Sequence, residues 1–235
     1  MNALTRSLSA YWISSIGKKF IVALTGLVLV LFLAGHLTGN LVVFLGREPF
    51  NDYAQFLHHF LHGGGVWLAR IGLLFCLVLH VWATILLTMQ NKAARQPYAY
   101  KNTIKATKSS RMMIWSGLTI LAFVVYHLMH FTLHLGNSYG SDEYTYVYNG
   151  AKRHDAWKMV IDGFSVWYVV LFYAISMTLL CSHLGHGVQS IFQTLGLRTR
   201  KSEGFIRLLS QGYSFFIWAG FLSIPVAIFF FKFGR

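Results

Sequence analysis

The sequence predicts an all-α integral membrane protein built as a bundle of five transmembrane helices. Only 11% of its 235 residues are charged, whereas soluble domains average about 25%. The hydrophobic residues, 55% of the total, fall in long blocks, and many Trp and Tyr lie near the block ends, where their rings favour the lipid headgroup layer. We therefore expect the whole chain, residues 1–235, to form one transmembrane domain.

Five apolar blocks are long enough to cross the hydrocarbon core, which requires about 20 helical residues. They cover residues 20–45, 66–90, 112–135, 162–192 and 208–232. The fourth block exceeds the minimum, which predicts a tilted helix or one that projects beyond the bilayer. Residues 50–62 have helical apolar spacing and predict a short interfacial helix, which the tract Gly63-Gly64-Gly65 ends. The Tyr-rich residues 137–158 predict a small cap.

Lysine and arginine are concentrated in alternate gaps between the blocks. The basic segments contain Arg6, Lys18 and Lys19, then Lys92, Arg95, Lys101, Lys105, Lys108 and Arg111, and then Arg198, Arg200, Lys201 and Arg207. The positive-inside rule therefore predicts a cytoplasmic N-terminus, an outer C-terminus and insertion in the inner (cytoplasmic) membrane of a prokaryote. The net charge of +13 does not indicate nucleic acid, because it lies in short gaps and not on an amphipathic face. We expect these charges to set the orientation of the helices, to contact anionic lipid and to bind a partner at the basic face.

Histidine is the residue type that predicts a function. Seven of the 11 His fall within the predicted spans, at least one in each of the first four: His36, His80, His127, His130, His134, His183 and His186. A buried polar group in lipid costs several kcal/mol without a partner, and the spans contain almost no carboxylates. Neutral imidazole is a good ligand for haem iron. The alternative interpretation is that these side chains form hydrogen bonds between helices.

Depth along the helices separates the histidines into two levels. With a rise of about 1.5 Å per residue, His36 and His127 lie toward the outer side, and His80 and His183 lie toward the cytoplasm. Two levels with two histidines each are what two stacked b haems, each with two histidine ligands, require. Small residues beside these positions would let a flat ring approach, although they also mark plain helix contacts: Ala34, Gly35, Gly39, Gly185 and Gly187. Candidate partners for haem propionates are Lys19 and Arg111 inside, and Arg70 and His62 outside.

Four segments together resemble a known family: SSIGKKFIVALTG (14–26), AGHLTGNL (34–41), VVYHLMHFT (124–132) and HLGHGVQSIFQTLG (183–196). They are similar to the diheme cytochrome b membrane-anchor subunit of succinate dehydrogenase and fumarate reductase. The resemblance extends over nearly the whole chain, and the 183–196 segment is its most specific part. It implies that helices one and three hold one haem and that helices two and four hold the other, nearer the catalytic subunits.

Carried onto this sequence, the resemblance pairs His36 with His127 in the outer haem and His80 with His183 in the inner one. His130 and His186 are the alternative ligands. The family pattern of a ligand four residues before a glycine favours His183 over His186. Some relatives have a glutamate, linked to proton movement, two residues before this ligand. Cys181 stands there in this chain, so we do not expect that proton path.

The resemblance also implies partners: a flavoprotein subunit and an iron–sulfur subunit on the cytoplasmic side. This sequence has no cysteine cluster and no dinucleotide-binding glycine motif, so the dicarboxylate chemistry belongs to those partners. Electrons would pass through the two haems to a membrane quinone, with menaquinone favoured. Candidate residues for the quinone site are Asp52, Tyr53, His58, His59 and His62. The alternative for this cluster is a solvated interfacial helix.

Two other functions are compatible with a few-helix bundle rich in histidine. One is the cytochrome b subunit of another quinone-linked oxidoreductase, such as a hydrogenase or formate dehydrogenase. The order of the histidines over helices one to four and the 183–196 segment argue against it. The other is a transporter with a histidine-lined path. Transporters often have internal repeats and broken helices, whereas Pro225, the one intraspan proline, lies in the helix without histidine.

Overall fold

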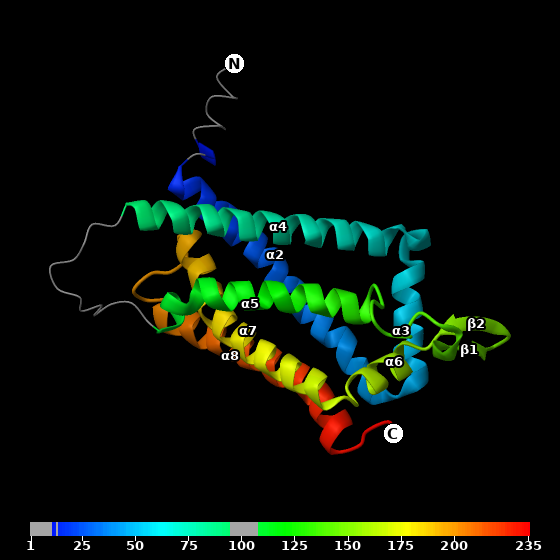
Figure 1. Cartoon of the computed structure of the whole chain (residues 1–235). Coiled ribbons are helices and arrows are strands. Elements are labelled where there is room, and N and C mark those ends of the chain that lie inside the picture. The colour runs from blue at the N-terminus through cyan, green and yellow to red at the C-terminus, as the bar shows by residue number, and fades with distance from the viewer. Residues whose placement is uncertain (1–10, 13, 95–107) are drawn as a thin grey trace.

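Five long apolar helices make up most of the molecule (Figure 1). In this computed structural model, residues 11, 12, 14–94 and 108–235 are described, residues 108–111 by their backbone only. The five helices, each long and apolar enough to span a membrane, are α2 (Ser15–Leu41), α4 (Gly64–Ala93), α5 (Lys108–Phe131), α7 (Trp167–Thr194) and α8 (Glu203–Phe230). The predicted helical class, with five long apolar helices that could span a membrane, is confirmed.

Two predicted boundaries are wrong. Helix α5 ends at Phe131 and not at 135, because His134 and Gly136 have left-handed backbone angles that stop the helix. The fourth block, expected as one long helix over 162–192, contains the end of a separate short helix, α6 (Ala156–Gly163), which is followed by a turn and then by α7. The first residues of the block therefore belong to α6 and to the turn, and the block is not one continuous helix that projects beyond the bilayer.

A cap of short elements covers one end of the bundle. It contains the 3-10 turns η1 (Val42–Leu45), η2 (Phe60–Gly63) and η3 (Asp142–Tyr144), helices α3 (Arg47–His59) and α6, and the hairpin of β1 (Thr145–Tyr148) and β2 (Ala151–His154). The strands are antiparallel, with Thr145 opposite His154, and their tight turn has positive φ at Asn149 and Gly150, as a two-residue hairpin requires. The helix predicted over 50–62 is found as α3 followed by η2, and the cap predicted over 137–158 contains η3, the hairpin and the start of α6.

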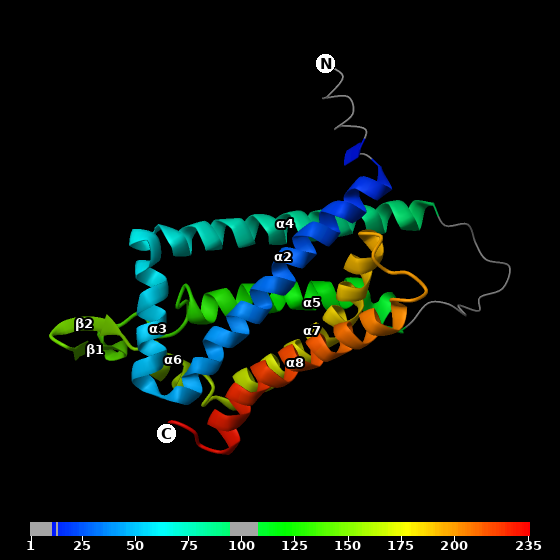
Figure 2. The same cartoon turned by 180° about the vertical axis from the view of Figure 1, so that it is seen from behind.

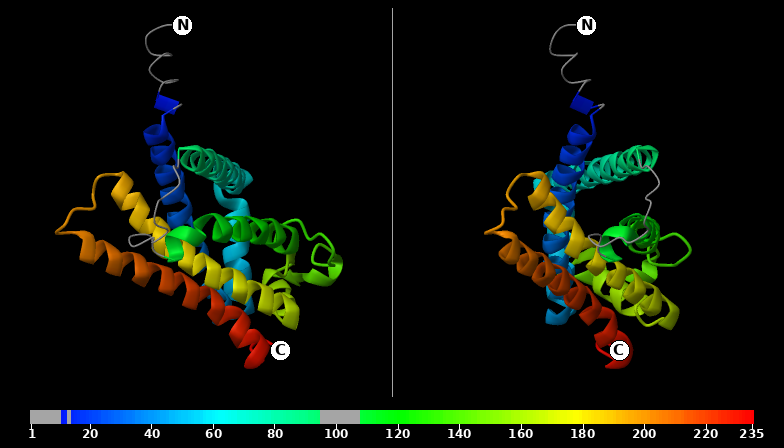
Figure 3. Two further views of the ribbon diagram at one scale, coloured as in Figure 1. Left: turned by 60° about the vertical axis from the view of Figure 1, so that its left-hand side comes forward. Right: turned by 90° about the vertical axis from the view of Figure 1, so that its left-hand side faces the viewer.

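Helix α2 crosses the bundle diagonally and packs against α4, α7 and α8, while α5 packs on α7 and α7 on α8 (Figures 1 and 2). The start of α2, the end of α4, the start of α5 and the α7–α8 loop lie at one end of the bundle. Helix α3, the hairpin, α6 and the C-terminus lie at the other end (Figures 2 and 3). Within the described residues, α4 and α5 make at most isolated contacts with each other. The space enclosed by α2, α4, α5 and α7 is therefore not filled by direct packing of α4 on α5.

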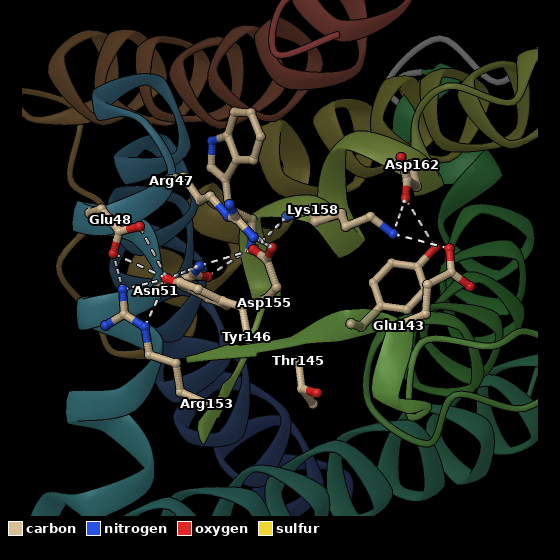
Figure 4. A network of polar contacts seen from close by, with 12 residues as sticks. Arg47, Glu48, Asn51, Glu143, Thr145, Tyr146, Arg153, Asp155, Lys158 and Asp162 are labelled. Atoms are coloured by element: carbon tan, nitrogen blue, oxygen red, sulfur yellow. Dashed lines mark hydrogen bonds and ion pairs between the residues drawn. The ribbon is translucent and has the colours of Figure 1, made fainter. Parts of the chain in front are cut away.

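A buried ion network joins α3 to α6 in the cap (Figure 4). The Asp155 side chain, 1% exposed, accepts hydrogen bonds from Arg47 Nε (2.9 Å), Asn51 Nδ2 (2.9 Å) and the backbone N–H of Lys158 (3.1 Å). The last of these caps the N-terminus of α6. Burial alone would raise the pKa of the Asp155 carboxyl, but these hydrogen bonds outweigh it and hold the pKa below its usual value.

A second arginine ties the hairpin to the same helix. The side chain of Arg153, on β2, is 6% exposed and pairs with Glu48 and with Asp52 (2.6 Å), both on α3. Its guanidinium lies 3.9 Å from the Tyr148 ring centroid, close enough for a cation–π contact. The hairpin is thus held on the bundle by charge and aromatic contacts, although its tip projects away from the helices (Figure 1).

Candidate functional site

A large apolar cavity lies between the first four long helices. Its volume is about 1600 Å³, above the range of about 300–1000 Å³ that is usual for one drug-sized ligand. One histidine from each of these helices lines it: His36 of α2, His80 of α4, His127 of α5 and His183 of α7. The four residues that the sequence singles out as ligands therefore face one common space.

The helix ends place these histidines at two levels. His36 lies five residues before Leu41 and His127 four residues before Phe131, close to the ends of α2 and α5 at the cap. His80 and His183 each lie sixteen residues after the first residue of their helices, which begin at the cap. This corresponds to about 24 Å along the helix axis. The positions agree with the two predicted pairs.

Hydrogen bonds orient the two deeper histidines. Thr25 donates its hydroxyl proton to the carbonyl oxygen of Ile21 (2.6 Å), and the same hydroxyl oxygen lies 3.1 Å from Nδ1 of His80. Because a hydroxyl has one proton, the oxygen that donates to Ile21 accepts from Nδ1 of His80 in the tautomer with its hydrogen on Nδ1. His80 also makes a hydrogen bond with the backbone of Val22. In this tautomer, Nε2 is the ring nitrogen that would bind a metal ion in the cavity.

His183 has the same arrangement on the other side of the cavity. The Ser116 hydroxyl donates to the carbonyl of Met113 (3.1 Å) and lies 3.1 Å from Nδ1 of His183. In the same tautomer, the His183 imidazole would donate from Nδ1 and bind a metal ion through Nε2. A ligating histidine in a metal protein usually donates its other ring N–H in this way, which fixes its tautomer.

Each histidine nearer the cap also has a polar side chain beside its ring. Nδ1 of His127 lies 3.2 Å from the Tyr173 hydroxyl, and the amide of Asn40 lies against the ring of His36 at 3.3 Å from Nδ1. The ring centroids of His36 and His127 are 5.8 Å apart, with planes at 83°. Two imidazoles on opposite sides of one metal ion, with bonds of about 2 Å, would have centroids about 6 Å apart. The spacing suits a shared metal ion.

Two glycines let the deeper rings approach the neighbouring helix. A Cβ on Gly26 of α2 would lie 3.2 Å from the His80 ring, and one on Gly117 of α5 would lie 3.4 Å from the His183 ring. The sequence analysis missed both, because a single sequence does not show which residues face each other across helices. The glycines it named beside the histidines are elsewhere: Gly39 faces Tyr53, Gly185 faces Ser214, and Gly35 and Gly187 open onto the cavity.

The alternative ligands do not reach the cavity. His130 is buried behind Tyr173, and His186 is half-buried on another face of α7; neither lines the cavity. His134 stacks on His154 of the cap, with ring centroids 5.7 Å apart. Within the described residues, no three His, Cys, Asp or Glu side chains come together as metal ligands. The candidate donors are thus paired histidines.

The candidate propionate partners are divided. Lys19 and Arg70 line the cavity, whereas His62 is exposed outside it, and the side chain of Arg111 lies outside the described part of the chain. Ser190, Gln193 and Thr194 of α7 are among the further polar residues that line the cavity. Their separation from His183 by about two and three helical turns is a sequence signal that could have placed Ser190 and Thr194 on the same face.

The candidate quinone cluster is also divided. Only Tyr53 lines the large cavity, where its ring packs against Gly39. Asp52 is paired with Arg153, and it shares a shallow outer groove with His59. His58 and His62 are exposed and line neither space. The structure therefore does not gather these five residues into one site.

Tyr139 and Tyr144, in the segment between α5 and β1, are buried and do not line the cavity. Burial raises the pKa of Tyr139 and of Tyr144 to about 12 each, and the Asp162 carboxylate, which accepts a 3.0 Å hydrogen bond from Tyr144, adds to the shift of Tyr144. Both phenols therefore stay protonated at neutral pH.

Comparisons with models of known protein families, with curated proteins and with solved structures found no match for this chain. The fold and the cavity define a multi-pass helical membrane protein with a histidine-lined space between its first four long helices.

Proposed function

We propose that this chain is the diheme cytochrome b membrane anchor of a succinate:quinone oxidoreductase. The observation that carries the proposal is the cavity, in which first- and third-helix histidines face one level and second- and fourth-helix histidines face another. This is the arrangement of paired ligands that the family resemblance implies.

The residues present fit two haem b groups. His36 and His127 would hold the outer one, and His80 and His183 the inner one, with Nδ1 of three of these rings near a hydroxyl oxygen. Bound haem would supply one-electron carriers between the iron–sulfur subunit and a membrane quinone. Lys19 would neutralise a propionate at the inner end, and Arg70 would do so nearer the cap.

Charge supports the proposed orientation and partners. Six of the seven acidic residues lie in the cap: Glu48, Asp52, Asp142, Glu143, Asp155 and Asp162. Among the described residues, the opposite end has Glu203 as its only acid and nine basic residues: Lys18, Lys19, Lys92, Lys108, Arg111, Arg198, Arg200, Lys201 and Arg207. The positive-inside rule then places that end in the cytoplasm, where flavoprotein and iron–sulfur subunits would dock. Quinone, with menaquinone favoured, would react near Tyr53 at the outer level. The same path would serve succinate oxidation or fumarate reduction.

The test is the haem content of the purified chain with its co-purifying partners. A dithionite-reduced minus oxidised spectrum and a pyridine haemochrome assay should give two haems b per chain. Separate His→Ala variants at 36 and 127 should lose the outer haem, and variants at 80 and 183 the inner one.

Matched controls are His130→Ala and His186→Ala, which remove nearby imidazoles that do not line the cavity. Both should keep two haems. One haem in the folded wild-type protein would contradict the pairing, and folded protein without haem would contradict the cytochrome function and favour a histidine-lined transporter.

A further inference from the structure

Tyr173 contacts two histidines at once. Its hydroxyl oxygen lies 3.2 Å from Nδ1 of His127 and 3.3 Å from Nδ1 of His130. Tyr173 and His130 are 6% and 8% exposed, so little water can replace either contact. The three side chains come from two helices, α5 and α7, at the level of the outer pair.

The number of available hydrogens determines which group donates and which accepts in this cluster. The tyrosine hydroxyl has one hydrogen, and a neutral imidazole has one N–H. If Nε2 of His127 binds iron, its hydrogen must be on Nδ1, and Nδ1 donates to the Tyr173 oxygen. The Tyr173 O–H is then free to donate to Nδ1 of His130, whose own hydrogen is on Nε2.

Resting on the proposed function, we infer that Tyr173 and His130 form a positioning pair that tunes the outer haem through His127. A ligating imidazole whose Nδ1–H is hydrogen-bonded is more basic and stabilises the oxidised metal more strongly. His130 strengthens this effect, because an O–H that donates to His130 makes the Tyr173 oxygen a better acceptor.

Within the described residues, the hydroxyls beside the inner histidines, His80 and His183, are not bonded to a second imidazole. Nδ1 of His80 lies near the Thr25 hydroxyl and Nδ1 of His183 near the Ser116 hydroxyl, and His80 also bonds to the backbone of Val22. Both hydroxyls donate to backbone carbonyls of their own helices, whereas the Tyr173 hydroxyl would donate to a second imidazole, that of His130. The two sites therefore differ in their outer hydrogen bonds although their ligands are the same.

The experiment is a redox titration of both haems in the purified complex, with each potential assigned by the variant that loses one haem. Tyr173→Phe should keep both haems and move only the outer potential to a more positive value. The expected size is about a tenfold change in the reduction equilibrium, or ~59 mV for one electron. His130→Asn should move the same potential in the same direction by less.

Ser116→Ala is the matched control, because it removes the equivalent hydroxyl from the inner site. It should raise the inner potential and leave the outer one unchanged. An unchanged outer potential in Tyr173→Phe with both haems bound would overturn the inference, as would equal shifts of both potentials. Wild-type protein without haem would instead refute the proposed function, so the two failures are distinguishable.

Discussion

Asp155 is the residue that joins the two halves of the cap. It is buried, it caps α6, and it receives hydrogen bonds from Arg47 and Asn51 of α3. A buried carboxylate is stable only when its charge is paired and its oxygens are hydrogen-bonded. The chain meets that requirement with two side chains from one helix and a backbone N–H from another.

This arrangement predicts that the cap weakens in acid. Because the folded-state pKa of Asp155 lies below the ordinary value of 3.8, its contribution is complete above that pH and is lost as pH falls through the folded pKa. Asp155→Asn should cost about 1–3 kcal/mol at neutral pH, since Arg47 is partly exposed. The measurement is the thermal midpoint in detergent at pH 7 and below pH 4.

The control is Asp142→Asn, which removes a carboxylate that is 90% exposed and paired with Lys152. It should leave the thermal midpoint nearly unchanged, because exposed ion pairs contribute little to stability. If Asp155→Asn lost as much stability in acid as the wild type, Asp155 would not be the titrating group.

At the scale of the element, α2 and α4 meet where the His80 ring lies against Gly26. Gly26 admits the His80 ring, and the Thr25 hydroxyl beside it orients the same ring. Two successive residues of α2 thus fix one side chain of α4. The inner site therefore depends on the spacing of two helices as well as on its ligands.

Gly26→Val should displace His80, because the new Cβ would lie 3.2 Å from the ring before the added methyl groups are counted. We expect the haem content to fall from two to about one per chain, with the inner haem lost. Gly212→Val on α8, where a Cβ meets nothing within 4 Å, is the matched control and should keep both haems. Full haem content in Gly26→Val would show that α2 and α4 can separate without loss of the site.

The elements were predictable to different degrees. Long apolar blocks predict transmembrane helices reliably, because the bilayer sets both their length and their composition. The break between α6 and α7 was missed because its residues are as apolar as the helices they join. The ligand positions followed from depth, but Thr25, Ser116 and Tyr173 did not, because contacts across helices leave no mark in a single sequence.

At the scale of the whole molecule, the acids and bases separate along the bundle. Six of the seven acidic residues lie in the cap, and the described basic residues are more numerous at the opposite end. The helix ends that border successive gaps lie at alternate ends of the bundle, as the alternation of basic gaps predicts (Figure 1). The side of the membrane on which each end lies remains a prediction from the positive-inside rule.

Reporter fusions test that orientation. Alkaline phosphatase fused after Arg235 should be active, because we expect the C-terminus outside. The same enzyme inserted in the α7–α8 loop after Arg200 should be inactive. The reverse pattern would place the cap in the cytoplasm and would contradict the docking surface proposed for the catalytic subunits.

The ion pair between Arg47 and Asp155 also has a consequence for biogenesis. Its partners are 108 residues apart, and both α4 and α5 lie between them. The first partner emerges early in synthesis and must wait, unpaired, until two more helices have been inserted. The cap can therefore close only late in membrane insertion, when α2, α4 and α5 have been made and α7 is the one cavity-lining helix still to follow.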